Sequence, residues 1–322
     1  MKILVIRLSS LGDIIITEPV VHTLATQFPV AEIYYLVKPG FKDLMLTFPA
    51  NLTILPWNDD LDSLIKLRRI KFDILIDLHN KPNTALIRLF CRAKIKTIYN
   101  KKHSLRHAIV THKTTQSISS TLDLYFSALS KINISPEPRF PQIVPDDSAK
   151  ELMKNHGLKN NDFILIFPGA TSNTKRWLTQ YFAELIDLID PSMKVVLAGG
   201  NSEKSITSEV ADLCHHNIIN LTAKTNLRQL ISLTDNARAV IANDSGPAHI
   251  AAALQKPQIT IFGATSPKLG FAPLNDKNVL ISQNLPCSPC SLHGSNSCPL
   301  HHFNCMKAIT PQFVYKELLK IL

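Results

Sequence analysis

The hydrophobic residues of this 322-residue chain are grouped in short runs, separated by polar turns and by stretches of helical periodicity. Short apolar runs bounded by turn residues predict strands that are buried on both faces, as in parallel sheets. Strands alternating with helices indicate an α/β fold in which helices cover both faces of parallel sheets. The predicted strands are residues 3–6, 33–37, 73–78, 163–167, 194–198, 239–242 and 258–262.

The length of the chain predicts two domains, because 322 residues are long for one hydrophobic core. The strand and helix pattern stops at a proline-rich segment, residues 135–147, and starts again after it. Segments of this kind are typical of domain boundaries. We predict an N-terminal domain over residues 1–145 and a C-terminal domain over residues 146–309. We expect a final helix over residues 310–322 to pack back on the N-terminal domain.

The composition, with 45% hydrophobic and 19% charged residues, is that of a globular enzyme. No apolar run reaches the roughly 18 residues that a membrane-spanning helix needs. Arg7 and Asp13 interrupt the N-terminal apolar run too early for a signal peptide, so we expect a cytoplasmic protein. The net charge of +10 indicates an anionic partner, which could be nucleic acid, a membrane surface or an acidic substrate.

Much of the positive charge lies between Leu78 and Thr121, a stretch that contains no Asp or Glu. It is either a solvated basic face or a surface that meets an acidic acceptor or lipid headgroups. Aromatic residues are sparse in it, which argues against nucleic acid as a partner. The candidate residues facing an acceptor or a membrane are Arg88, Arg92, Lys101, Lys102 and Arg106.

Polar segments that directly follow strands carry the candidate chemistry, because ligands bind at the carboxyl ends of strands in open α/β sheets. The first such segment, residues 7–13, reads Arg-Leu-Ser-Ser-Leu-Gly-Asp. Its single glycine disfavours a dinucleotide-binding Gly-x-Gly-x-x-Gly motif. Asp13 either caps its own helix or places a carboxylate at the edge of the sheet.

The segment from Pro168 to Trp177 begins with small residues and ends with two cations. Small residues let the backbone approach phosphates, and Lys175 or Arg176 can neutralise them. Alternatively, Trp177 anchors the following helix and both cations are solvated.

The segment Asn243-Asp244-Ser245-Gly246 follows another strand and opens an alanine-rich helix. Unpaired N–H groups and the dipole at a helix start attract an anion such as a diphosphate. Asp244 repels phosphate, so we expect it to cap the helix, to bind sugar hydroxyls or to orient Lys175. His249 either donates to a phosphate oxygen or is a core histidine.

Four of the six cysteines form a late cluster near several histidines. This composition suits a structural zinc ion, although the spacing is not that of a common zinc finger. Reduced thiols, or a disulfide formed on isolation, are the alternatives. A catalytic zinc is not expected, because the cluster lies downstream of the strand-end segments. The cluster consists of Cys287, Cys290, Cys298 and Cys305.

Taken together, these segments resemble glycosyltransferase family 9, the bacterial ADP-heptose:lipopolysaccharide heptosyltransferases. The resemblance runs nearly end to end, and it is carried by residues 7–13, 168–170, 175–177 and 243–249. The late cysteine run is similar to one that is common in that family, especially near heptosyltransferase II.

The resemblance implies a GT-B fold, with two Rossmann-like domains whose parallel sheets face each other across a cleft. It implies an inverting, metal-independent transfer of heptose from ADP-heptose to the lipopolysaccharide inner core, at the cytoplasmic face of the inner membrane. In it, Asp13 is the general base and Lys175 assists the leaving group. The residues implied in donor binding are Ser10, Gly12, Gly169, Ala170, Thr171, Gly199, Glu203, Thr225, Asp244, Ser245, Gly246 and His249.

Three other functions fit parts of the sequence. A GT-B enzyme could use another nucleotide sugar, such as a UDP-hexosamine. A non-catalytic relative could bind nucleotides or lipids on the same scaffold, although Asp13, Lys175 and Asp244 are all retained. A zinc-binding nucleic-acid module would use the cysteine cluster. The residues alone leave the nucleotide base, the acceptor sugar and the oligomeric state open.

Overall fold

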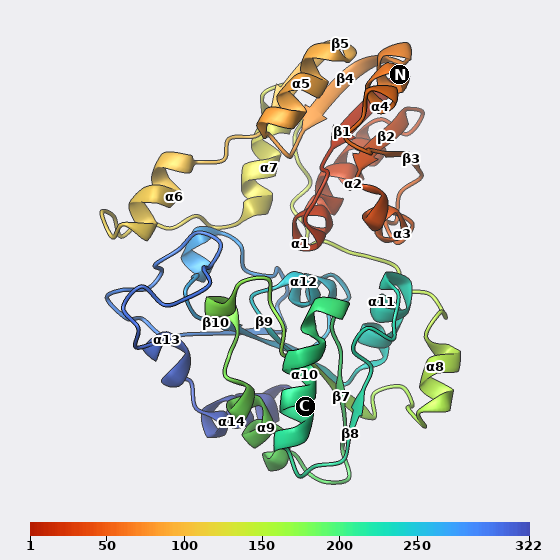
Figure 1. Ribbon diagram of the computed structural model, residues 1–322. Coiled ribbons are helices and arrows are strands. Elements are labelled where there is room, and N and C mark those ends of the chain that lie inside the picture. The colour runs from red at the N-terminus through yellow and green to blue at the C-terminus, as the bar shows by residue number, and fades with distance from the viewer. The chain divides into compact units, whose positions relative to one another are not determined.

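The computed structural model describes residues 1–322, and the chain divides into two compact units. The first unit comprises Met1–Lys102 and Ser120–Val144, and the second comprises His103–Ser119 and Pro145–Leu322. Each unit contains one parallel β-sheet with its own helices (Figure 1). None of the helices has both the length and the apolar character needed to cross a membrane.

The first unit is built on a five-stranded sheet of order β3-β2-β1-β4-β5, in which all neighbours are parallel. Helices α4 and α5 cover one face, where Leu67 and Ile87 pack into a core cluster with Leu4 and Leu75. Helices α2 and α7 contact each other elsewhere in the unit. The elements are β1 (Lys2–Ile6), α1 (Leu11–Ile15), α2 (Glu18–Gln27), β2 (Glu32–Val37), η1 (Pro39–Phe41), α3 (Lys42–Met45), β3 (Leu52–Pro56), α4 (Leu61–Arg69), β4 (Lys71–Asp77), α5 (Pro82–Phe90), β5 (Arg92–Ile98) and α7 (Thr121–Ser130).

The proline-rich segment that precedes the second unit is held along the first unit. The N–H of Glu137 donates to Thr23 Oγ1 at 3.1 Å, and the N–H of Gln142 donates to Glu18 Oε2 at 2.9 Å. Burial raises the pKa of Glu18. The N–H of Val144 then donates to the carbonyl of Thr47 at 2.7 Å. The main connection between the units is therefore shorter than the predicted linker.

The second unit is built on a six-stranded parallel sheet of order β11-β10-β9-β6-β7-β8. Strands β6, β9 and β10 are completely buried, which explains their continuous apolar sequences. The elements are α6 (His103–Val110), α8 (Lys150–Asn155), β6 (Phe163–Phe167), η2 (Asn173–Lys175), α9 (Thr179–Leu188), β7 (Lys194–Leu197), η3 (Asn201–Glu203), α10 (Lys204–Leu213), β8 (Ile218–Asn220), α11 (Leu227–Asn236), β9 (Ala239–Asn243), α12 (Gly246–Ala253), β10 (Gln258–Phe262), η4 (Pro267–Leu269), β11 (Asn278–Ser282), α13 (Asn304–Lys307) and α14 (Pro311–Ile321).

The C-terminal helix differs from the expectation that it returns to the N-terminal domain. Helix α14 packs against α9 and β10 in the second unit. Its apolar face explains this position, because Val314 and Leu318 are fully buried in the core cluster that contains Trp177 and Phe182. Helix α14 is thus an outer layer of the second sheet.

The segment around α6, His103–Ser119, was predicted to belong to the N-terminal domain, which ends at residue 145. In the structure this segment belongs to the second unit. Helix α6 contacts η4, and the N–H of Ile118 donates to the carbonyl of Lys268 at 2.9 Å. The Arg106 guanidinium lies over the ring of Phe271, 4.3 Å from its centroid. These contacts fix the end of the basic segment on the second unit.

Parallel pairing places the carboxyl ends of all strands of a sheet at one edge. In the second sheet β9, β6, β7 and β8 are consecutive neighbours. The loops that follow these four strands are therefore adjacent, although they are far apart in the sequence.

Candidate functional site

Lys175 lies in the loop after β6 and forms a buried ion pair with Asp244, which follows β9. Lys175 Nζ is 2.8 Å from Asp244 Oδ2, and the two side chains are only 17% and 6% exposed. Thr265 Oγ1 donates to the same carboxylate oxygen at 2.7 Å. Of the expected roles of Asp244, the structure favours orienting Lys175, because the two side chains are paired and Ser245, not Asp244, occupies the N-cap position of α12.

Asn243 ties the same two loops together below the ion pair. Its side-chain oxygen accepts from the N–H of Trp177 at 2.9 Å, and its amide nitrogen donates to the carbonyl of Pro168 at 2.7 Å. The indole of Trp177 is buried, donates to the carbonyl of Ile309 at 2.9 Å and packs edge-on against Phe182. Trp177 thus anchors its helix in the core while Lys175 stays paired beside it.

The start of α12 has the geometry of an anion site. Ser245 is extended at the N-cap, Gly246 is the first helical residue, and no side chain caps the helix. The first N–H groups of a helix have no intrahelical partner, and the helix dipole adds positive potential there. His249, one turn later, is buried, with 8% of its surface exposed.

Two glycine turns close around the Glu203 carboxylate at the ends of β6 and β7. Glu203 Oε2 accepts from the N–H of Gly200 at 2.7 Å. A Cβ added at Gly169 would lie 1.9 Å from Glu203 Oε1, and one at Gly199 would lie 2.6 Å from Oε2. A side chain at either position would displace the carboxylate, so the two glycines leave room for Glu203 beside the turn that leads to Lys175.

The remaining predicted donor residues of the second unit lie on these loops or on the loop after β8, whereas Ser10 and Gly12 belong to the first unit. Ala170 is buried beside Gly169, whereas Thr171 is exposed. The loop after β8 is tied to the β7 loop, because the N–H of Ala223 donates to the carbonyl of Gly199 at 2.9 Å. Thr225 is half-buried in that loop. The structure therefore brings the predicted donor residues of the second unit to one edge of its sheet.

The cysteine-rich segment, residues 287–305, supports the loop that carries Lys175. The N–H and the hydroxyl of Thr174 donate to the carbonyl of Ser295 at 3.1 and 3.0 Å, and the N–H of Ser295 donates back to the hydroxyl at 2.8 Å. Ser172 Oγ donates to the carbonyl of His293 at 3.1 Å. Between these contacts Gly294 has a φ of +83°, and a Cβ there would lie 2.8 Å from Lys175 Cγ.

All six cysteines of the chain are free thiols. Cys287 Sγ lies 3.9 Å from His302 Nε2, and burial raises the pKa of Cys305 to about 11. No three His, Cys, Asp or Glu side chains are grouped so that they could hold a metal ion. The structural zinc therefore stays a prediction from the sequence.

In the first unit, Asp13 lies at the carboxyl end of β1 and is held by Arg7. Asp13 Oδ2 is 2.5 Å from Arg7 Nη2 and accepts from Ser10 Oγ at 2.8 Å. Tyr125 Oη donates to Asp13 Oδ1 at 3.4 Å. Arg7 is buried and also donates to the carbonyl of Leu78 at 2.7 Å. Asp13 both contacts the start of α1 and presents a carboxylate at the sheet edge, and Gly12 is buried beside it in α1.

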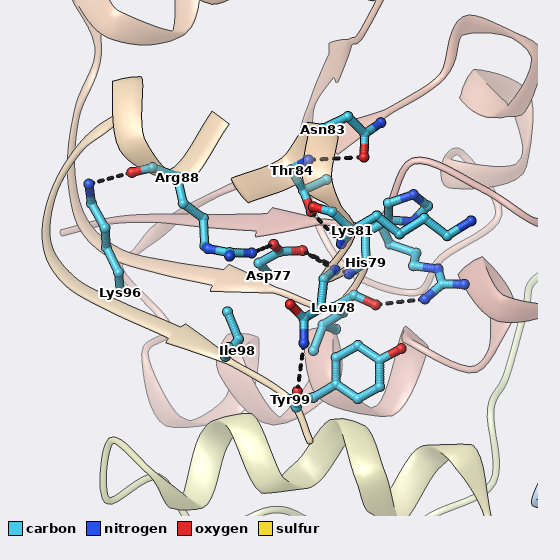
Figure 2. Close-up of polar contacts among 12 residues, drawn as sticks. Asp77, Leu78, His79, Lys81, Asn83, Thr84, Arg88, Lys96, Ile98 and Tyr99 are labelled. Carbon is cyan, nitrogen blue, oxygen red and sulfur yellow. Dashed lines mark hydrogen bonds and ion pairs between the residues drawn. The ribbon is translucent and has the colours of Figure 1, made fainter. Parts of the chain in front are cut away.

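Sequence reasoning missed His79, which follows β4 and lies near Arg7. Figure 2 shows the turn around it, in which Asp77 Oδ1 accepts from the N–H groups of His79 and Asn80, both at 2.8 Å. His79 is 3% exposed, and its Nδ1 has no hydrogen-bond partner. Burial, then the nearby Arg7 and other cations, lower the pKa of His79 to about 3, against the opposing effect of Asp13. The imidazole is therefore neutral.

Two of the five basic residues predicted to face an acceptor or a membrane instead make contacts within the protein. Arg88 points to Asp77, which is fully buried and needs a counter-charge (Figure 2). Arg106 is buried against Phe271. Arg92 and Lys102 are exposed, and Lys101 Nζ lies 5.9 Å from the centroid of Tyr99.

The sequence profile of glycosyltransferase family 9 (heptosyltransferase) matches residues 63–301. The chain belongs to this family. The predicted family resemblance is thereby confirmed, and the chain is a glycosyltransferase.

Similar proteins cover most of this family 9 glycosyltransferase. It is 30% identical over 289 residues to lipopolysaccharide heptosyltransferase 1 of Campylobacter coli. The aligned residues cover 82% of this chain and 84% of that protein. It is 26% identical over 293 residues to the lipopolysaccharide core heptosyltransferase OpsX of Haemophilus influenzae, with 86% and 83% covered. The structure of E. coli ADP-heptose lps heptosyltransferase II matches with a TM-score of 0.78 and 26% identity, over 100% of this chain and 98% of that one. The predicted GT-B class of α/β fold is confirmed.

The neutral His79 predicts a pH dependence of stability. In the unfolded chain a histidine takes up a proton below about pH 6.5, whereas folded His79 does so only near pH 3. The free energy of unfolding should therefore fall as the pH is lowered from 6.5 to 5, by about 2 kcal/mol from this group. Urea denaturation at the two pH values should show a smaller loss for His79→Gln than for the wild type. The exposed His107→Gln should behave as the wild type, and equal losses in all three proteins would contradict this account.

The position of Gly294 predicts that the cysteine-rich segment affects ligand binding at the loop that carries Lys175. An alanine there is strained at positive φ, and its Cβ displaces Ser172 and Lys175. We expect Gly294→Ala to weaken ADP binding about tenfold or more, measured by calorimetry. Gly157→Ala is the matched control, because Gly157 has a φ of +63° with nothing within 4 Å of the added Cβ. It should lose stability and keep its affinity for ADP. Equal affinities of the two variants would refute this effect.

Proposed function

We propose that this family 9 glycosyltransferase transfers heptose from ADP-heptose to the inner core of lipopolysaccharide. The observation that carries the proposal is the buried Lys175–Asp244 pair, which lies beside the start of α12. The names of the similar proteins support the choice of sugar and acceptor, since they are lipopolysaccharide heptosyltransferases. The name of the E. coli structure adds ADP-heptose as the donor.

In this proposal the second unit binds the donor and stabilises its leaving group. The diphosphate gains negative charge as the bond to the sugar breaks, and preorganised donors lower the barrier to that step. The Lys175 ammonium and the N–H groups at Ser245 and Gly246 act as these donors. Asp244 holds the ammonium in place from the side of the protein. Glu203, whose carboxylate also accepts from the N–H of Gly200, accepts hydrogen bonds from ribose hydroxyls.

The first unit supplies the base. Asp13 takes the proton from the acceptor hydroxyl while that oxygen attacks the anomeric carbon, and a single displacement inverts the configuration there. Arg7 and Ser10 fix the orientation of the carboxylate. Because Lys175 and the helix start provide the positive charge, this route needs neither a metal ion nor another cofactor.

The acceptor chemistry explains the charge of the protein. An inner-core acceptor is an anionic glycolipid, and the net charge of +10 favours its approach. We place the enzyme at the cytoplasmic face of the inner membrane, with no nucleic acid as a partner.

Asp13→Asn tests the proposed base. The amide keeps the shape of the side chain but does not accept the proton, so kcat for heptose transfer should fall by about 10²- to 10⁴-fold. The affinity for ADP should be unchanged, because in this proposal Asp13 acts on the acceptor. Asp147→Asn, at a side chain that is 77% exposed, is the control and should keep full activity. Transfer by Asp13→Asn at the rate of the control would disprove this role.

A further inference from the structure

Helices α4 and α5 expose large apolar side chains on the outside of the first unit. The sides that face the sheet are apolar too, since Leu67 and Ile87 are buried in the core. Core packing therefore does not explain the outer residues. The exposed ones are Leu61 (77%), Ile65 (50%), Leu86 (56%), Leu89 (74%) and Phe90 (43%).

These side chains belong to neighbouring elements. Leu67 of α4 and Ile87 of α5 share one core cluster, so the two helices cover the same face of the sheet (Figure 1). Arg68 Nη1 donates to the carbonyl of Phe90 at 3.3 Å, which joins the ends of the two helices. Strand β5 directly follows α5 and forms the edge of the sheet. We call this region the α4–α5–β5 surface.

The same region is strongly basic. Residues 61–96 contain nine Lys or Arg and three Asp. Asp77 is buried and paired with Arg88, while Asp62 and Asp73 are paired with Lys66 and Lys94. The positive charge that remains is on Arg68, Arg69, Lys71, Lys81, Arg92 and Lys96.

Surfaces that lie in a membrane interface typically combine exposed leucine and phenylalanine with surrounding lysine and arginine. The apolar side chains enter the boundary between headgroups and acyl chains, and each cation near an anionic surface adds electrostatic attraction. A symmetric pair of chains fits this surface less well, because a two-fold interface brings each patch against its own copy. The cations of the two copies would then repel each other.

We propose that the α4–α5–β5 surface docks the enzyme on an anionic lipid bilayer. Leu86, Leu89 and Phe90 enter the interface, and the surrounding cations contact lipid phosphates. The purpose of this docking rests on the proposed function, since an acceptor that is a glycolipid lies in such a bilayer. The binding itself requires neither donor nor acceptor.

Co-sedimentation of the full chain with vesicles tests the proposal. Vesicles of phosphatidylcholine alone and of phosphatidylcholine with phosphatidylglycerol should be compared, without donor or acceptor. We expect binding to the anionic vesicles that weakens with salt. The double variants Leu86→Gln/Leu89→Gln and Arg68→Gln/Arg69→Gln should each lower the vesicle affinity tenfold or more. Leu319→Gln, on α14 with 56% exposure, is the matched control and should bind as the wild type does.

Two results would overturn the proposal. One is that the wild type does not bind anionic vesicles, or that both double variants bind them as the control does. The other is that Leu86→Gln/Leu89→Gln converts a dimer into a monomer in light scattering while vesicle binding is unchanged, which would make the surface a contact between copies. Heptose transfer to a delipidated core acceptor, measured separately, tests the proposed function without vesicles. The two failures are therefore distinguishable.

Discussion

A lysine ammonium that leaves water needs a counter-charge, and in the second unit Asp244 provides it for Lys175. Removing one partner of such a pair would leave a buried charge without compensation, which costs about 3–5 kcal/mol. The two residues come from loops after neighbouring strands, so the pair fixes β6 and β9 to each other at their carboxyl ends. Thr265 joins the loop after β10 to the same carboxylate. The geometry of the proposed diphosphate site depends on this pair.

The first unit uses the same principle at the end of its own central strand. Arg7 is buried and compensates Asp13, and it also binds the carbonyl after β4. His79 stays neutral beside them because another buried positive charge would be unfavourable. Each unit thus holds one chemically active side chain in place with a buried partner of opposite charge. This separates the two proposed tasks, which are proton removal and stabilisation of the leaving group.

The sequence predicted the seven inner strands because a strand buried on both faces is a continuous apolar run. It missed β3, β5, β8 and β11, which are the edges of the two sheets. The sequence of edge strand β5 is Arg-Ala-Lys-Ile-Lys-Thr-Ile, and most of its side chains are exposed. Such a mixed sequence lacks the continuous apolar run of an inner strand, so the sequence indicates only a basic stretch there. Loop glycines and Lys175 could be found because they directly follow inner strands. The positions of His79 and Tyr125 could not, because they depend on which strand and which helix pack beside β1.

The most direct test of the Lys175–Asp244 site is heptose transfer from ADP-heptose to truncated inner-core acceptors, followed by mass spectrometry. The wild type should add one heptose to at least one acceptor and should give no product with a UDP-hexosamine. Lys175→Met should abolish the transfer, because the leaving diphosphate loses its cation. A hexosamine product without a heptose product, or transfer by Lys175→Met at the wild-type rate, would contradict the account.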